Sequence, residues 1–324
     1  MAITLTDNEF FSGLTNLALF MRIYAGNTSR KPDDFVDAFM TDVLDVGNTK
    51  IFPYADLPSV ANYSETSSLL TVTKPTVGEE YLQVTEKKVV KSSYSAKILD
   101  AAFTSEYGMN DFIGYLLGQM ESAKTAYLYD VIINDLFTKS YGAGSGAGAK
   151  QLHTVDMISY TGLTSLADLN GAHSRNAKAL ALAIQDDIEN IQVYNTVYNR
   201  KGLKEAIDYK DLRIVILAPY RNEDVMEVMA SLLKSDVITR DFDKPDVLII
   251  PSIKIPENRT QEIAWILHKA SYQLFYKFTV MTNFFDASNL CVNNFLHFWY
   301  GKGWVDALPS CKLIKNEISL SAEA

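Results

Sequence analysis

The chain has 324 residues, of which 48% are hydrophobic and 21% are charged. That balance supplies enough apolar surface for a full core, so it excludes a disordered protein and predicts one large or two modest globular domains. The 39 acidic residues outnumber the 30 basic ones, giving a net charge of -9. Tight binding to a phosphate backbone is therefore not expected.

Membrane and disulfide chemistry are also not expected. No run of about 18 uninterrupted apolar residues occurs, so the sequence predicts no membrane span. The apolar stretch at residues 10–26 contains Asn16 and Arg22, and its helical spacing indicates an amphipathic helix rather than a signal peptide. The two cysteines, Cys291 and Cys311, lie far apart without a CxxC pattern, which predicts reduced thiols and no zinc site.

Residues 1–50 are predicted to form a helical arm. A capped start at Thr6-Asp7 leads one periodic stretch, and a second helix is expected from Lys31 to Leu44. Its Pro32 in the first turn, followed by Asp33, suits a helix N-terminus.

Residues 51–101 change character and predict an extended hairpin region. Its Val- and Thr-rich stretches, Leu69–Val77 and Tyr81–Val90, read as strands separated by Gly78. An isolated two-stranded ribbon is marginal in water, so we expect this ribbon to dock on another surface, such as a second subunit.

Residues 102–150 predict one long helix and a linker. Apolar residues recur at steps of three and four over 109–138, which predicts a helix on the order of 45 Å long. The segment Gly142–Gly148 predicts a flexible break and a domain boundary.

Residues 151–262 alternate between helical and strand patterns and predict a compact α/β domain. The expected elements are a helix at Ser174–Asn199, a strand at Leu212–Ala218, a helix at Asn222–Leu233 and strands at Val247–Pro251 and Glu262–Leu267. In the last part, residues 263–324, polar residues alternate with Tyr272, Leu274, Tyr276 and Phe278, which predicts a half-buried strand, and an aromatic strand is expected at Phe295–Tyr300.

Motifs for catalysis, cofactors or metals do not emerge. Ala149 separates the glycine cluster from Lys150, which breaks a phosphate-loop pattern. The histidines show no paired metal-ligand spacing; His268 and His297 are expected within packed strands. The carboxylates at Asp186, Asp187 and Glu189 are expected on a solvated helix face. No cofactor and no enzymatic activity are therefore expected.

One mixed-charge cluster on the hairpin leaves two readings open. Glu86, Lys87, Lys88 and Lys91 form either an ordinary soluble surface or a set of charges that fixes register against a neighbouring subunit.

The order of elements resembles a known fold. A helical arm, a projecting hairpin, a long spine helix, a compact α/β domain and terminal aromatic strands resemble the α+β capsid fold of the Hong Kong 97 type. Its N-terminal arm, E-loop, P-domain spine and A-domain would correspond to those parts in that order.

A more specific likeness lies in the segment 290–299. Leu290, Asn293, His297 and Trp299 match a Leu-x-x-Asn-x-x-x-His-x-Trp strand that resembles the one in phi29-like podovirus major capsid proteins. The segment Tyr127–Leu136 is similar to the end of their spine helix.

This resemblance implies a major capsid protein that assembles as pentamers and hexamers into an icosahedral head around phage double-stranded DNA. It implies copies of the chain as partners, with scaffolding, portal or decoration proteins as further candidates, no sequence-specific DNA binding, and assembly in the host cytoplasm into the virion. Within that reading, Glu86, Lys87, Lys88 and Lys91 are predicted intersubunit contacts. Phe295, His297 and Trp299 are predicted as the buried seam of the spine domain.

Two alternatives stay open. An encapsulin-like bacterial compartment shares the fold but needs a cargo pocket. A cytosolic α/β enzyme with a scattered site predicts a discrete oligomer with a deep polar pocket.

Overall fold

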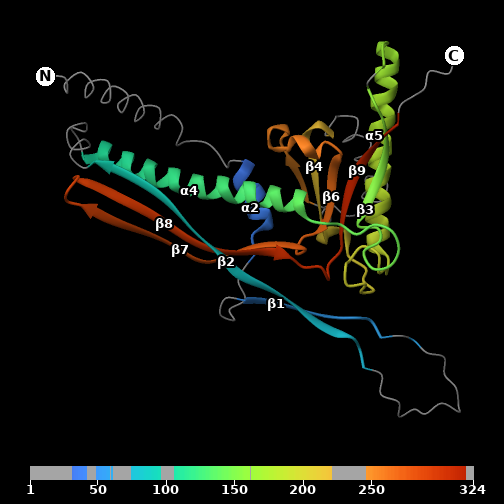
Figure 1. The fold of residues 1–324 in the computed structure, drawn as a ribbon, viewed down its shortest axis with the longest axis horizontal. Helices are drawn as coiled ribbons and strands as arrows, with labels where there is room; N and C mark the ends of the chain where they lie inside the picture. The colour runs from blue at the N-terminus through green and yellow to red at the C-terminus, as the bar shows by residue number, and fades with distance from the viewer. Residues whose placement is uncertain are drawn as a thin grey trace. The chain divides into compact units, whose positions relative to one another are not determined.

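The computed structural model describes residues 31–41, 49–58, 60, 74–95, 106–160, 162–220 and 246–318 (Figure 1). The predicted helix at Thr6-Asp7, the helix at 222–233 and most of the strand at 69–77 lie outside these ranges. The chain divides into two units, each built from separate stretches of sequence. The first unit comprises residues 1–48, 83–132 and 274–302, and the second comprises 49–82, 133–273 and 303–324. Both units mix helix and strand, as the α+β class predicts.

A four-stranded sheet has the strand order β1-β2-β8-β7. Its strands are β1 (Thr49–Ala55), β2 (Val77–Ser95), β8 (Cys291–Trp304) and β7 (Tyr272–Asp286). The β2 strand pairs antiparallel with β8, although more than 190 residues separate partners such as Lys91 and Phe295 in the sequence. The sequence therefore predicted the ribbon strand within 81–90 correctly, but β2 is longer and its partner lies near the far end of the chain.

The long helix predicted at 109–138 is confirmed as α4 (Glu106–Thr138). The predicted apolar stripe accounts for its buried side: Met120, Leu128 and Ile132 are at most 2% exposed. In the first unit, Phe35 packs edge-on against Tyr129 with ring centroids 5.0 Å apart. This contact fixes the shorter helix beside the spine.

That shorter helix, α2 (Lys31–Phe39), ends earlier than the sequence predicted. Instead of continuing to Leu44, the chain becomes extended at Met40, which forms a bridge with Leu274 of β7. Thr41 N donates to Leu274 O at 2.9 Å. A backbone hydrogen bond to the sheet edge thus replaces the next helical one.

The second unit contains a five-stranded mixed sheet with the order β3-β9-β6-β4-β5. Its strands are β3 (Leu152–Ile158), β9 (Ser310–Ile318), β6 (Glu262–His268), β4 (Leu212–Leu217) and β5 (Asp246–Ile250). The β3–β9 and β4–β5 pairs are parallel, whereas β6 is antiparallel to both of its neighbours. Short 3-10 turns occur at Tyr209–Asp211, Ala218–Tyr220, Ser252–Lys254 and Glu257–Arg259.

The helix α5 (Leu166–Gln192) packs on this sheet. It begins eight residues before the predicted Ser174, because Ser165 caps it: the Ser165 hydroxyl accepts from Asp168 N at 3.1 Å. Its apolar face, including Leu180 and Ile184, joins the core of the sheet. On the strand β6, Trp265 is fully buried and meets the Phe137 ring edge-on at 5.1 Å. Apolar packing on both sides explains why β4 and β6 are buried along nearly their whole length.

The glycine segment 142–148 is an ordered turn, which corrects the prediction of a flexible linker. Gly142 N donates to Gln151 Oε1 at 3.2 Å, and Gln151 is fully buried. A side chain on Gly142 would meet Gly148 O at 2.5 Å, and Gly148 has a φ of +70°. Glycines are therefore required here by close approach and left-handed backbone rather than by flexibility. The domain boundary that the sequence predicts at residues 142–148 stays a prediction.

None of the helices in the described ranges is long and apolar enough to cross a membrane. The two cysteines are unpaired with each other: Cys291 is partly exposed and Cys311 is buried. The sequence prediction of free thiols is confirmed.

Candidate interaction surface

The register of β2 with β8 sorts their side chains onto two faces of the sheet. Lys88 lies opposite Phe298, while its neighbour Lys87 lies opposite Trp299. Because successive side chains of a strand point to opposite faces, these two pairs mark opposite faces. The assignment then extends by alternation along both strands.

The face that includes Phe298 is covered by α4. Leu296, Phe298 and Tyr300 are each 1% exposed. The Tyr127 ring of α4 lies 6.2 Å from the Phe298 ring, and its hydroxyl is 3.1 Å from that of Tyr300. This face is the packed core of the first unit.

The opposite face combines lysines with aromatic rings, and we call it the lysine–aromatic face: Lys87, Val89, Lys91, Phe295, His297 and Trp299. Lys87 Nζ lies 4.5 Å above the Trp299 ring, and Lys91 Nζ lies 5.8 Å above the Phe295 ring. The Phe295 and His297 rings stack with centroids 6.2 Å apart. Val89 between the lysines is 41% exposed. Alternation places no acidic residue from the segments Lys87–Ser95 of β2 or Cys291–Trp304 of β8 on this face.

The predicted seam is therefore wrong by one residue. Phe295, His297 and Trp299 are only partly buried in the subunit, whereas the alternate residues Leu296 and Phe298 occupy the core. All of these side chains are apolar or aromatic, so hydrophobicity did not reveal which face α4 covers.

The predicted charge cluster is also divided between the two faces. Lys87 and Lys91 belong to the lysine–aromatic face. Lys88 forms an ion pair with Glu86 at 3.2 Å and lies 5.8 Å from the Tyr127 ring of α4. The hydrogen bond to Glu86 raises the pKa of Lys88. Glu86 and Lys88 thus already have partners within the subunit.

A buried polar network in the second unit was missed by the sequence analysis. Asp187, expected on a solvated helix face, is 2% exposed. Its carboxylate accepts hydrogen bonds from Tyr198 OH at 2.9 Å and Cys311 Sγ at 3.4 Å, and it pairs with His153 Nδ1 at 2.7 Å. Burial raises the pKa of the Cys311 thiol well above its usual value, so this cysteine is an inert donor to the carboxylate rather than a nucleophile.

This network predicts a pH dependence of subunit stability. The hydrogen bond to Asp187 raises the pKa of His153 in the folded state, with Asp186 reinforcing and Lys150 opposing that shift. The stabilisation is therefore complete below the unfolded pKa of about 6.5 and is lost as the pH rises through the higher folded value. We expect wild type to lose its stability advantage over His153→Asn when urea unfolding is repeated from pH 6 upward.

The quantity that tests this role is the difference in unfolding free energy between wild type and His153→Asn at each pH. Burial lowers the pKa of Lys139 to about 8, and this group contributes with the opposite sign in both proteins. An advantage of wild type that grows with pH would contradict the assigned role of His153.

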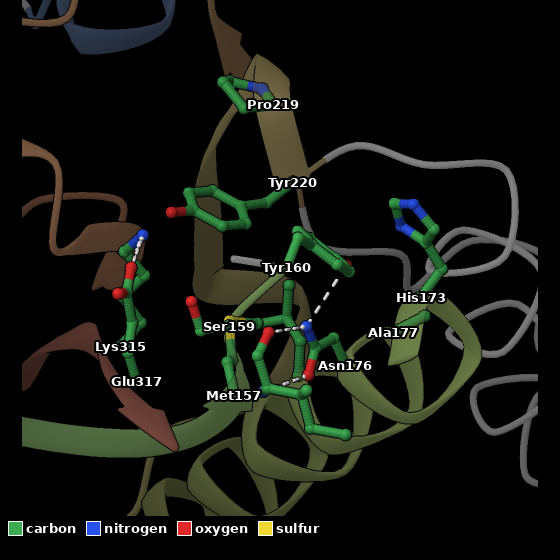
Figure 2. Close-up of a pocket in the computed structure, with 12 residues that line it drawn as sticks. Met157, Ser159, Tyr160, His173, Asn176, Ala177, Pro219, Tyr220, Lys315 and Glu317 are labelled. Atoms are coloured by element: carbon green, nitrogen blue, oxygen red, sulfur yellow. Dashed lines mark hydrogen bonds and ion pairs between the residues drawn. The ribbon is translucent and has the colours of Figure 1, made fainter. Parts of the chain in front are cut away.

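A pocket of about 240 Å³ lies beside the end of β3 and the first turns of α5 (Figure 2). Asn176 in its wall accepts from Ile158 N at 2.7 Å and donates to Ile158 O at 3.0 Å and to Tyr160 OH at 3.1 Å. The His173 ring packs against the Tyr160 ring at a tilt of 33°, with centroids 4.4 Å apart. On the other side, Lys315 pairs with Glu317 at 2.6 Å. These side chains use one another as partners, so the pocket is explained by packing.

Within the described ranges, no three or more His, Cys, Asp or Glu side chains gather closely enough to hold a metal ion.

Comparison with solved structures shows the fold. The capsid structure of the cyanophage P-SCSP1u matches with a TM-score of 0.54 and 14% identity, covering 88% of each chain. That of the Staphylococcus phage Andhra matches with a TM-score of 0.56 and 10% identity, covering 86% of this chain and 83% of the other. The mature capsid of bacteriophage PhiM1 gives a TM-score of 0.51 and 11% identity, covering 86% and 85%. The α+β architecture is therefore that of phage capsid proteins, consistent with the Hong Kong 97 type.

No curated protein matches the chain. The family model described as "Phi29-like phage major capsid protein" matches residues 27–314, which include the four-stranded sheet, the whole of α4 and the five-stranded sheet except the end of β9. The predicted family is thereby confirmed, and the chain belongs to the phi29-like phage major capsid proteins, the subunits of a phage head shell.

Proposed function

We propose that the lysine–aromatic face joins copies of this capsid subunit as pentamers and hexamers of an icosahedral head around phage double-stranded DNA. The observation that carries the proposal is that α4 covers one face of the β2–β8 pair while Lys87, Val89 and Lys91 stay exposed on the other. A closed shell requires each subunit to offer distinct complementary patches. Aromatic side chains at the centre of such a patch are typical of protein interfaces.

Charge supports a second copy as the partner of this face. Along Lys87–Ser95 and β8 the face carries lysines and no acidic residue, while the chain as a whole has a net charge of -9. A neighbouring subunit is therefore acidic on average and complementary to it. We assign Lys87 and Lys91 to the contact. Glu86 and Lys88, which pair with each other, would support the strand rather than bind the neighbour.

The β1–β2 ribbon offers a further contact surface. In the second unit its base is fixed: Glu80 pairs with Lys201 at 3.2 Å and accepts from Ala307 N at 3.2 Å, and Asp56 accepts from Lys204 N at 3.2 Å. Towards the loop that joins β1 to β2, Val77 and Glu79 of β2 are exposed. We propose that this ribbon acts as the E-loop and that residues 1–50 act as the N-terminal arm, with spine and A-domain following as the sequence predicts.

The net charge and the family also suggest how the subunit interacts with DNA and with other phage proteins. A net charge of -9 lets packaged DNA move along the shell without binding tightly, and a DNA mobility shift by the soluble subunit at physiological salt would contradict this. Scaffolding, portal or decoration proteins are proposed additional partners, and the host cytoplasm is the proposed place of assembly. Cosedimentation with phage components expressed together would test the partners.

The family match favours a phage head over the two alternatives. A bacterial compartment or a cytosolic enzyme is not what the matched family describes, and the matched family indicates a structural role. Particles that contain a cargo enzyme instead of DNA would reverse this choice.

Reversing the charge of the lysine–aromatic face is expected to abolish assembly without unfolding the subunit. In Lys87→Glu/Lys91→Glu, two carboxylates would face the acidic neighbour, so we expect shells seen by negative-stain electron microscopy to fall at least tenfold. Lys88→Glu makes the same change on the next residue of the strand, whose side chain is also exposed but points to the opposite face, beside Tyr127 of α4, and it should retain most of the shells. Circular dichroism and unfolding midpoints report whether each variant is folded. Normal shells from the folded double variant would contradict the role of this face.

A further inference from the structure

The strand β7 changes abruptly from buried to exposed. Tyr272–Phe275 are at most 1% exposed, whereas every side chain from Lys277 to Phe285 is exposed. The exposed stretch carries large apolar side chains on both faces of the strand: Phe278, Val280, Met281, Phe284 and Phe285, from 37% to 64% exposed. The sequence predicted a half-buried strand over 271–278, and that prediction is wrong, because both faces are buried at Tyr272–Phe275 and both are exposed from Lys277 onward. Apolar residues on both faces are typical of a strand that is buried on both sides.

This stretch also lies at an edge of its sheet. The β7 strand is the last in the order β1-β2-β8-β7. Its start is paired with Met40 and Thr41 at Leu274. Beyond Leu274, no other described strand lies on that side of β7. Along Phe278–Phe285, no described strand pairs with this edge, so its backbone N–H and C=O groups can bind another strand.

The usual protection of an edge strand is missing. Edge strands are commonly blunted by charged side chains or proline. The segment Phe278–Phe285 contains neither, and its valine, threonines and phenylalanines favour strand pairing. The composition of Phe278–Phe285 therefore favours pairing of this edge with another strand.

We propose that Phe278–Phe285 pairs antiparallel with the same segment of a second copy, so that one continuous sheet crosses the subunit boundary; this rests on the proposed shell function. A two-fold contact uses the same patch on both partners, so the patch has to be compatible with itself in charge. Phe278–Phe285 is uncharged and meets that condition. The lysine–aromatic face, with Lys87 and Lys91, would repel its own copy and does not.

The register follows from the side chains. A two-fold axis at Met281 brings each Phe278 opposite Phe284 of the second copy and each Val280 opposite Thr282. The Phe278 ring already packs against Trp299 at 5.2 Å, so the aromatic pair would extend an existing cluster. Aromatic pairs across antiparallel strands stabilise sheets.

Disulfide trapping tests the pairing and the register together. In Met281→Cys on a Cys291→Ser background, the two new thiols lie directly opposite each other, roughly 5 Å apart between Cα atoms, which suits a disulfide. Mild oxidation of the full chain should give mostly covalent dimers on a non-reducing gel. Thr279→Cys is the matched control: its two copies would lie roughly 14 Å apart and should stay monomeric, while a mixture of Thr279→Cys and Asn283→Cys chains should cross-link.

The outcomes separate this inference from the proposed function. Shells of Met281→Cys that give no covalent dimer would overturn the pairing and leave the shell function standing. Equal cross-linking of Thr279→Cys alone would overturn the register and the two-fold contact. If the wild-type chain forms no shells, the proposed function fails, yet a Met281→Cys dimer in solution would still support the pairing.

A charge exchange provides a second, non-covalent test. Met281→Glu and Met281→Lys each place like charges opposite each other at the axis, so each alone is expected to lose assembly at least tenfold. Mixing the two variants should restore it, because unlike charges then meet. Leu182→Glu, on an exposed position of α5, controls for an added surface charge. Failure of the mixture to restore assembly by two folded variants would count against the pairing.

Discussion

Replacing Phe298 with alanine is expected to destabilise the subunit by about 3 to 5 kcal/mol, as for other phenylalanines buried in a core. Phe298 is 1% exposed and packs against Tyr127 of α4. Phe295→Ala removes the same atoms from the other face of the same strand, where the ring is partly exposed, and should cost roughly 1 kcal/mol. Urea unfolding of the dissociated subunits, followed by circular dichroism, measures both.

The pair tests which face of β8 is the core. Equal losses would mean that both faces are buried in the subunit, which would remove the free surface proposed for assembly. Trp299 lies on the same face of β8 as Phe295. We therefore expect Trp299→Ala to reduce the number of shells strongly and to lower the unfolding midpoint only slightly.

Asp187→Ala is expected to cost about 3 to 5 kcal/mol of subunit stability, because removing one partner leaves the others buried without an acceptor. The His153 ring, the Tyr198 hydroxyl and the Cys311 thiol all lie against this carboxylate. Asp187→Asn keeps one acceptor oxygen and should lose less. The same urea experiment measures each variant.

The neighbouring Asp186 supplies the matched control. It is exposed on the same helix, so Asp186→Ala should change stability by no more than about 0.5 kcal/mol. A loss for Asp187→Ala that is no larger than this would show that the network does not hold α5 to β3 and β9.

The sequence predicted those parts of the fold that repeat a strong local pattern. The stripe of α4 recurs over about thirty residues, so its period alone identified the helix within three residues of its true start. The strands β3 and β9 were missed, and they are parallel partners that lie about 160 residues apart in the sequence. Local patterning carries little information about such a pair.

The sequence located the aromatic strand of the candidate surface, but it did not show which face of that strand is exposed. Every side chain from Phe295 to Tyr300 is apolar or aromatic, so alternation gave no sign of which face α4 would cover. Asp187 was misassigned for a related reason. Among Asp186, Asp187 and Glu189 it looks like one more solvated carboxylate, and only the fold brings His153 and Cys311 to it.

The unprotected edge of β7 also affects the solubility of the free subunit before assembly. A neutral, apolar strand with open hydrogen-bonding groups is a template for irregular aggregation as well as for ordered growth. Newly made chains that accumulate faster than shells close would therefore be lost to precipitates, so solubility sets a ceiling on the useful concentration of free subunit. A single lysine within Phe278–Phe285 would raise the concentration at which the free subunit stays soluble, but it would weaken shell assembly.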